Sequence, residues 1–110
     1  VPLHPRRLRM RGYSPPLVLA HTAARALNVR LCRNGLSRVR DTPEQAGLKD
    51  GERRDNLRGA FATRKQWTAL RVLLVDDVTT TGATMAACAT VLARARPKAV
   101  FGLALLRTCA

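Results

Sequence analysis

Aromatic side chains are scarce in this sequence of 110 residues. The single Trp, single Tyr and two Phe make up 4% of the chain, so a core has to be built mainly from Leu, Val and Ala. Hydrophobic residues nevertheless reach 46%, the proportion of an ordinary globular protein, which excludes a disordered chain. No run of about 18 uncharged apolar residues occurs, so no transmembrane helix is predicted. The length suits one domain, residues 1–110.

Cysteine is also rare, and its spacing excludes two classes of small protein. Cys32, Cys88 and Cys109 are far apart and form no C-x-x-C pair, so a zinc site within the chain is not expected. An odd number of cysteines argues against a secreted disulfide framework. We therefore expect reduced thiols and a cytoplasmic location.

Acidic residues are outnumbered almost three to one. Seven Asp and Glu face 20 Lys and Arg, which gives a net charge of +13 and a sequence pI near 11.6. Seventeen of the 20 are Arg, whose forked guanidinium suits phosphate oxygens. A nucleic acid, a phosphorylated small molecule or an arginine-rich proteome would each explain this charge, and composition alone does not choose between them.

The first part of the chain predicts one helix and short strands. Ser14 followed by Pro15 is a typical helix start, and apolar residues then recur at helical spacing to about residue 28. Segments 29–32 and 36–39 are strand candidates separated by an Asn-Gly turn, and 59–63 is another. The polar stretch 40–58 is predicted to be a long loop with one short helix near 49–57.

The last third of the chain shows the clearest pattern. The apolar run 72–75 predicts a strand buried on both faces and ended by Asp76 and Asp77. A turn over 79–84 leads into a helix from Ala83 to about Ala95, and 99–106 is a second apolar strand. Strand, helix and strand within so few residues indicate a βαβ unit and a parallel sheet. The predicted fold class is α/β.

The residues that follow the first of these strands have the chemistry of a ligand site. Ligands of parallel sheets bind where the strands end, and Asp76 and Asp77 stand at that position. Gly82 allows the backbone to approach a ligand, and the N–H groups of a tight loop before a helix form a nest for an anion. Two carboxylates suit ribose hydroxyls or a hydrated Mg²⁺. The pattern therefore predicts a ribose-5-phosphate site.

A simpler explanation exists for each part of this pattern. Solvated carboxylates and a threonine cap would also produce a strand-to-helix turn without any ligand. The complete string over 72–84 is much more specific than its parts. It lacks the Gly-Lys-Ser/Thr sequence of a Walker P-loop, so that class of nucleotide site is excluded.

The string 72–84 resembles the phosphoribosyl-pyrophosphate (PRPP) loop of type I phosphoribosyltransferases. Other positions are similar to the ComF family of competence-associated, phosphoribosyltransferase-like proteins, and they follow in order along the chain: residues 1–9, 11–13, Arg40, Thr42, Gln45, Arg53, Asn56 and 59–61. The resemblance implies a type I phosphoribosyltransferase-like parallel sheet flanked by helices. Because members of the family usually carry an N-terminal four-cysteine zinc module and a preceding strand, it also implies a chain truncated at its N-terminus.

The resemblance implies a role for each matching position. Asp76 and Asp77 match the pair that holds the ribose hydroxyls, with Mg²⁺ nearby. The loop that binds the 5′-phosphate corresponds to Thr80, Thr81, Gly82, Ala83 and Thr84. The segment expected to bind pyrophosphate corresponds to residues 3–7, within which the candidates are Leu3, His4, Arg6 and Arg7. Stretch 40–58 corresponds to a hood over the active site.

Two functions from different classes follow. The first is an enzyme that binds Mg²⁺·PRPP, or a nucleotide containing ribose 5-phosphate, and transfers the phosphoribosyl group to a nitrogenous base. The second is a non-catalytic module that binds nucleotides or single-stranded DNA, or works with competence proteins in DNA uptake. The sequence assigns no catalytic residue, acceptor base or oligomeric state.

Overall fold

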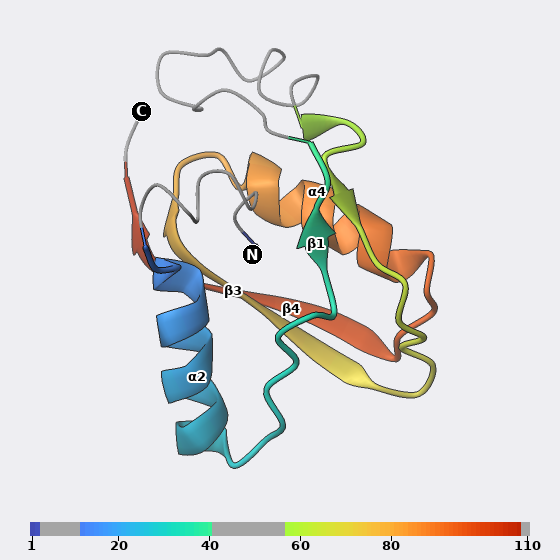
Figure 1. The fold of residues 1–110 in the computed structure, drawn as a ribbon, viewed down its shortest axis with the longest axis horizontal. Helices are drawn as coiled ribbons and strands as arrows, with labels where there is room; N and C mark the ends of the chain where they lie inside the picture. The colour runs from blue at the N-terminus through green and yellow to red at the C-terminus, as the bar shows by residue number, and fades with distance from the viewer. Residues whose placement is uncertain (3–11, 41–56, 109–110) are drawn as a thin grey trace.

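A computed structural model describes residues 1–2, 12–40 and 57–108 of the chain. Within these residues, helices and strands follow one another in a mixed α/β order (Figure 1). The elements are α2 (Pro15–Leu27), β1 (Ser37–Arg38), β2 (Phe61–Ala62), β3 (Arg71–Thr79), α4 (Ala83–Ala93) and β4 (Ala99–Arg107). The predicted α/β class is confirmed.

The βαβ unit at the end of the chain is confirmed, with one correction. Strands β3 and β4 are parallel neighbours, in register from the pair Arg71–Ala99 to the pair Thr79–Arg107. The prediction that Asp76 and Asp77 end the first strand is wrong, because β3 continues to Thr79. Backbone pairing with β4 outweighs the low strand propensity of aspartate at this place. The two carboxylates are therefore the sixth and seventh of the nine residues of the strand.

The two faces of the β3–β4 sheet differ in how they are covered. Helix α4 lies over one face, where a Cβ added to Gly102 of β4 would stand 3.4 Å from Met85 Sδ. On the other face, Leu73 of β3 is 37% exposed and its partner in register, Phe101, is 55% exposed. The predicted burial on both faces is therefore confirmed for Val72, Leu74 and Val75 but not for Leu73, which the described part of the chain leaves partly exposed.

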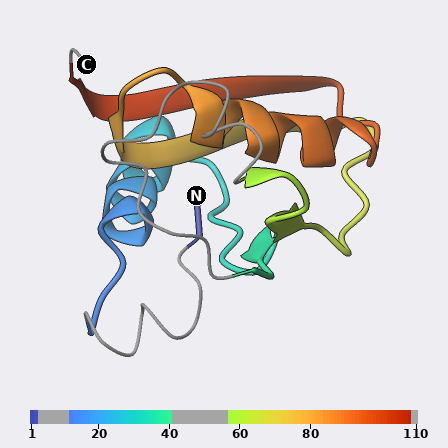
Figure 2. The ribbon, with the colours of Figure 1, turned by 90° about the horizontal axis from the view of Figure 1, so that it is seen from above.

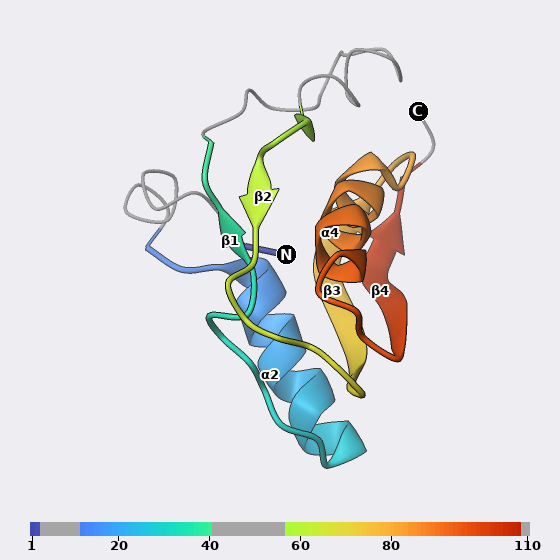
Figure 3. The ribbon, with the colours of Figure 1, turned by 90° about the vertical axis from the view of Figure 1, so that its right-hand side faces the viewer.

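The helix predicted from about residue 15 to 28 is confirmed as α2. The Ser14 side chain caps it by accepting a hydrogen bond from the Leu17 N–H at 3.4 Å, and proline occupies its first turn. The helix ends at Asn28, which adopts a left-handed conformation with φ of 54°. Helix α2 packs against β3 (Figures 1 and 3).

Strands β1 and β2 form a short antiparallel pair in which Ser37 is the partner of Ala62. Figure 2 shows this pair on the side of β3 away from β4. The strands predicted over 36–39 and 59–63 are thus confirmed at their centres. The strand predicted over 29–32 is wrong: no ladder forms there, because the chain reverses at Asn28 and at the turn that follows. The short helix predicted near 49–57 lies outside the described residues except for its last position.

The core forms between α4, β3 and the segment before β3. Trp67 is 7% exposed, and its indole N–H donates to Thr63 Oγ1 at 3.0 Å. Gly35 lies against the indole ring: a Cβ added to this glycine would lie 2.5 Å from a ring carbon. Trp67 is therefore a packing residue of the core. The other core residues are Leu57, Ala60, Phe61, Val72, Leu74, Cys88 and Leu92.

Candidate functional site

The two carboxylates near the end of β3 have different surroundings. Asp76 is 8% exposed, whereas Asp77 is half-buried. The backbone N–H of Asp77 donates to Asp76 Oδ1 at 2.9 Å, and that of Val78 donates to Asp77 Oδ1 at 2.9 Å. Each carboxylate is thus oriented by the next peptide of the strand. The two residues are adjacent in the second half of a parallel strand, two positions before its last residue, Thr79.

Burial changes the acidity of one of these groups. Removal from water, together with a side-chain hydrogen bond with Asp77, raises the pKa of Asp76 from the ordinary 3.8 to about 6. A carboxyl with such a pKa exchanges its proton near neutral pH. Its ionised form is able to accept hydrogen bonds from hydroxyl groups.

The loop after β3 leads directly into α4. Gly82 precedes the helix in a left-handed conformation with φ of 83°, and as the N-cap residue it provides no side-chain cap of its own. A Cβ added to Gly82 would meet no atom within 4 Å. The open space beside the backbone is what a ligand anion needs for a close approach to peptide N–H groups.

Two contacts hold this loop in place. The Ala83 N–H donates to Thr81 Oγ1 at 3.3 Å, and the Ala86 N–H donates to the Gly82 carbonyl oxygen at 2.8 Å, which closes the first turn of α4. At the end of β3, the Thr108 N–H donates to the Thr79 carbonyl oxygen at 2.9 Å, so the far end of β4 supports the start of the loop. The expected phosphate-binding residues therefore come together at one edge of the sheet, beside Asp76 and Asp77.

The pyrophosphate candidates cannot be placed in the same way. Leu3, His4, Arg6 and Arg7 lie outside the described residues, as does most of the expected hood over 40–58. Of the hood, the Arg40 guanidinium donates a hydrogen bond to the Arg58 carbonyl oxygen, which brings the two ends of this stretch together.

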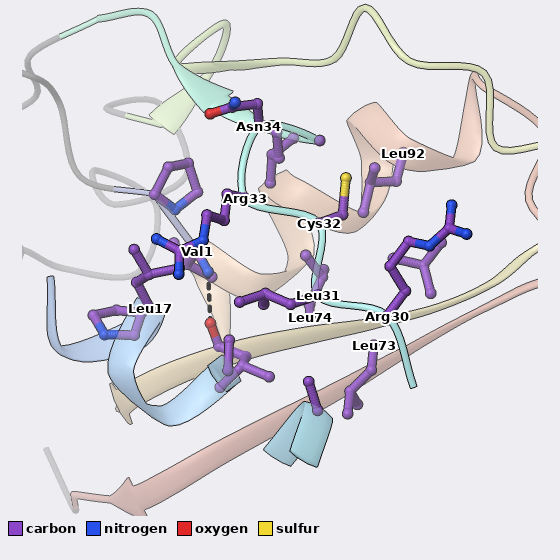
Figure 4. A pocket seen from close by; sticks show the side chains of 18 of the residues that line it. Val1, Leu17, Arg30, Leu31, Cys32, Arg33, Asn34, Leu73, Leu74 and Leu92 are labelled. Atoms are coloured by element: carbon purple, nitrogen blue, oxygen red, sulfur yellow. Dashed lines mark hydrogen bonds between the residues drawn. The ribbon is translucent and has the colours of Figure 1, made fainter. Parts of the chain in front are cut away.

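Sequence reasoning missed a large cavity between α2, segment 29–38 and β3. Its volume is about 1130 Å³, and Figure 4 shows Leu31, Leu73, Leu74 and Leu92 among the side chains that line it. The Val1 backbone nitrogen donates to the Val75 carbonyl oxygen at 2.5 Å at one side of this cavity. Its lining includes none of residues 76–84. The cavity is made by segments distant in sequence, so no local pattern could have indicated it.

Two further tests concern the described part of the chain only. Residues 1–2, 12–40 and 57–108 contain no group of three or more His, Cys, Asp or Glu side chains that could hold a metal ion. Neither α2 nor α4 is long and apolar enough to span a lipid bilayer.

Comparisons with known proteins identify relatives. The chain is 39% identical over 88 residues to Competence protein F of Haemophilus influenzae, which covers 77% of this chain and 38% of the relative. It is 36% identical over 94 residues to DNA utilization protein YhgH of Salmonella typhi, and 34% identical over 108 residues to the protein of that name in Escherichia coli K12. The aligned part of this chain covers 41% of the Salmonella protein and 48% of the Escherichia coli protein.

The chain therefore spans less than half the length of these relatives. No family model matches it, and no solved structure matches it significantly. The identities nevertheless extend over 77–98% of this chain and agree with the resemblance found from its motifs. The chain belongs to the ComF family.

Proposed function

We propose that the end of β3 and the loop before α4 bind a phosphoribosyl ligand, with Mg²⁺·PRPP as the donor of a phosphoribosyl group to a nitrogenous base. The observation that carries this proposal is the juxtaposition of Asp76 and Asp77 with the open turn at Gly82. The fold that we propose is that of a type I phosphoribosyltransferase, of which β3, α4 and β4 form a part. We also propose a cytoplasmic location, where free thiols such as Cys32 and Cys88 stay reduced.

Each part of the site has its own task in this proposal. The ionised carboxylates accept hydrogen bonds from the vicinal hydroxyls of the ribose. The N–H groups at the start of α4, with the hydroxyls of Thr80, Thr81 and Thr84, hold the 5′-phosphate, and the helix dipole favours its negative charge. Positioning of the anomeric carbon and neutralisation of charge are then the main contributions of the protein.

The residues present fit Mg²⁺ as a cofactor. Mg²⁺ commonly binds through one or two carboxylates, with water and ligand phosphates completing its shell, so a larger protein cluster is not needed. Asp77 is accessible enough to bind the ion through water, and Asp76 lies beside it. When bound, the ion would neutralise the pyrophosphate of the donor. Arg6 and Arg7 remain our candidates for the same anion.

The experiment is a calorimetric titration of the full protein with ribose 5-phosphate, which isolates the phosphate and ribose contacts. Gly82→Val should lower the affinity at least about tenfold, because a branched side chain enters the space that the phosphate needs. The matched control is Gly59→Val, at another positive φ of 69° with open space around its Cβ and outside the candidate site. Equal affinities of the two folded variants would contradict the proposal.

A second candidate function, the binding of single-stranded nucleic acid, is favoured by the charge of the described surface. Residues 12–40 and 57–108 carry 13 Lys and Arg but only two acidic residues, Asp76 and Asp77. Relatives in this family are named for competence and DNA utilization. Such a function does not exclude the first, because it needs a different surface.

A further inference from the structure

Seven exposed cations gather at the edge of the sheet opposite the candidate site. Strands β3 and β4 begin at this edge and α4 ends there, since the strands are parallel and the helix between them runs back. We call these residues the basic edge: Arg30, Arg64, Lys65, Arg71, Arg94, Arg96 and Lys98, all of them exposed.

Backbone and side-chain contacts hold parts of this edge together. The Lys98 N–H donates to the Leu70 carbonyl oxygen at 2.7 Å, and Thr68 bridges to Pro97, so the segments before β3 and before β4 lie side by side. Lys65 reaches across to segment 29–38, where its ammonium stands 3.4 Å from Cys32 Sγ and 4.8 Å from the centroid of a Trp67 ring. The segments that carry Lys65, Arg71 and Lys98 are thus held side by side.

The two edges of the sheet are electrically separate. All carboxylates of the described residues lie at the far edge, at Asp76 and Asp77. Asp76 is five positions after Arg71 along β3, which is roughly 16 Å at about 3.3 Å per residue. This distance is about twice the Debye length of about 8 Å at physiological ionic strength. A polyanion on the basic edge is therefore little affected by the carboxylates or by a ligand bound there.

An exposed aromatic ring adjoins the basic edge. Arg71 and Leu73 share a face of the sheet with Phe101, which is the partner of Leu73 in register. Phe101 is 55% exposed, and Arg30 and Arg71 line the same cavity rim as this ring. Cations beside an exposed ring are the combination that holds phosphates while a base stacks.

From this arrangement, we propose that the basic edge and Phe101 bind single-stranded DNA, and that they do so independently of the phosphoribosyl site. The proposal rests on the second candidate function and gives it a place on the molecule. Phosphates contact Arg71, Lys98 and their neighbours, and an unpaired base stacks on Phe101. Duplex DNA keeps its bases stacked inside the helix and cannot use the ring.

The test is fluorescence anisotropy of the full protein with a labelled 20-nucleotide oligo(dT), measured from 50 to 200 mM salt. The double variant Arg71→Ala/Lys98→Ala should bind more weakly at low salt, with a log–log salt slope smaller by about 1.4, from about 0.7 per lost phosphate contact. The loss of affinity between 50 and 200 mM is then about sevenfold smaller than in the unmodified protein.

The matched control removes the same charge elsewhere. Arg25→Ala/Arg107→Ala takes two exposed cations from α2 and from the far end of β4, and it should leave the slope unchanged. Equal effects of the two pairs would overturn the proposal, since they would show attraction by net charge alone.

Two further measurements separate its parts. Phe101→Leu should lower the affinity at least about fivefold without a change in slope, because it removes a stacking surface and no charge. Equal binding of a duplex of the same length would overturn the assignment to single strands. Ribose 5-phosphate should bind Arg71→Ala/Lys98→Ala as it binds the unmodified protein. If ribose 5-phosphate binds neither protein, the phosphoribosyl site fails while the DNA result stands.

Discussion

Replacement of the buried carboxyl by an amide, Asp76→Asn, should change how stability depends on pH. Asp76 has a folded-state pKa of about 6 against an ordinary 3.8, mainly because it is buried. The raised pKa means that the folded chain holds this proton up to about pH 6, whereas the unfolded chain loses it near pH 4. Unfolding between these values therefore releases a proton, so the contribution of Asp76 to stability falls as pH rises.

The magnitude follows from the shift in pKa. About two pKa units at 1.36 kcal/mol each correspond to roughly 3 kcal/mol, lost between about pH 4 and pH 6 and constant above that window. The amide has no proton to lose. The free energy of unfolding of Asp76→Asn, minus that of the unmodified chain, should therefore increase by about 3 kcal/mol between pH 3.5 and pH 7.

Urea unfolding in metal-free buffer at half-unit pH steps measures this difference, in which the titrations of all other groups largely cancel. Asp77→Asn is the companion variant. It removes the hydrogen bond between the two side chains, which is a smaller cause of the raised Asp76 pKa, but leaves Asp76 buried. Part of the decrease in stability with pH that Asp76 causes should therefore remain. A difference that is flat, or that decreases towards pH 7, would refute the assignment of a buried, weakly acidic carboxyl to the end of β3.

Two other predictions concern packing and thiol chemistry. Gly35→Ala should lower the free energy of unfolding in urea by about 1–3 kcal/mol, because its Cβ would lie 2.5 Å from the Trp67 ring. Gly102→Ala meets only a flexible methionine at 3.4 Å and should lower it by less than about 1 kcal/mol. Equal losses would contradict this packing. Peptide mapping after brief alkylation should show Cys32 modified and Cys88 protected. Cys88 is fully buried, and burial raises the pKa of its thiol to about 12. Labelling of both thiols at the same rate in the folded state would contradict this prediction and show that the core around Cys88 opens readily.

The helix start at Ser14 and the βαβ unit followed from the sequence alone, because their causes are local. The start of α2 depends on a capping side chain and a proline in the first turn, and β3 depends on an apolar run. Each of these features acts over a few neighbouring residues. The position of the candidate site at the end of a strand followed for the same reason. Asp76, Asp77 and Gly82 are consecutive features of one strand, loop and helix.

Other features depended on contacts between distant segments. The extension of β3 to Thr79 comes from pairing with β4, which overrides the propensity of two aspartates. The raised pKa of Asp76 requires burial, and burial depends on everything packed around the strand. The basic edge joins residues from four stretches of the chain, which net charge could not locate. The sequence by itself thus determined the chemistry of the loop and the kinds of elements, whereas the tertiary structure decided which distant charges, rings and cavities lie together, because side chains far apart in sequence meet only when the chain folds.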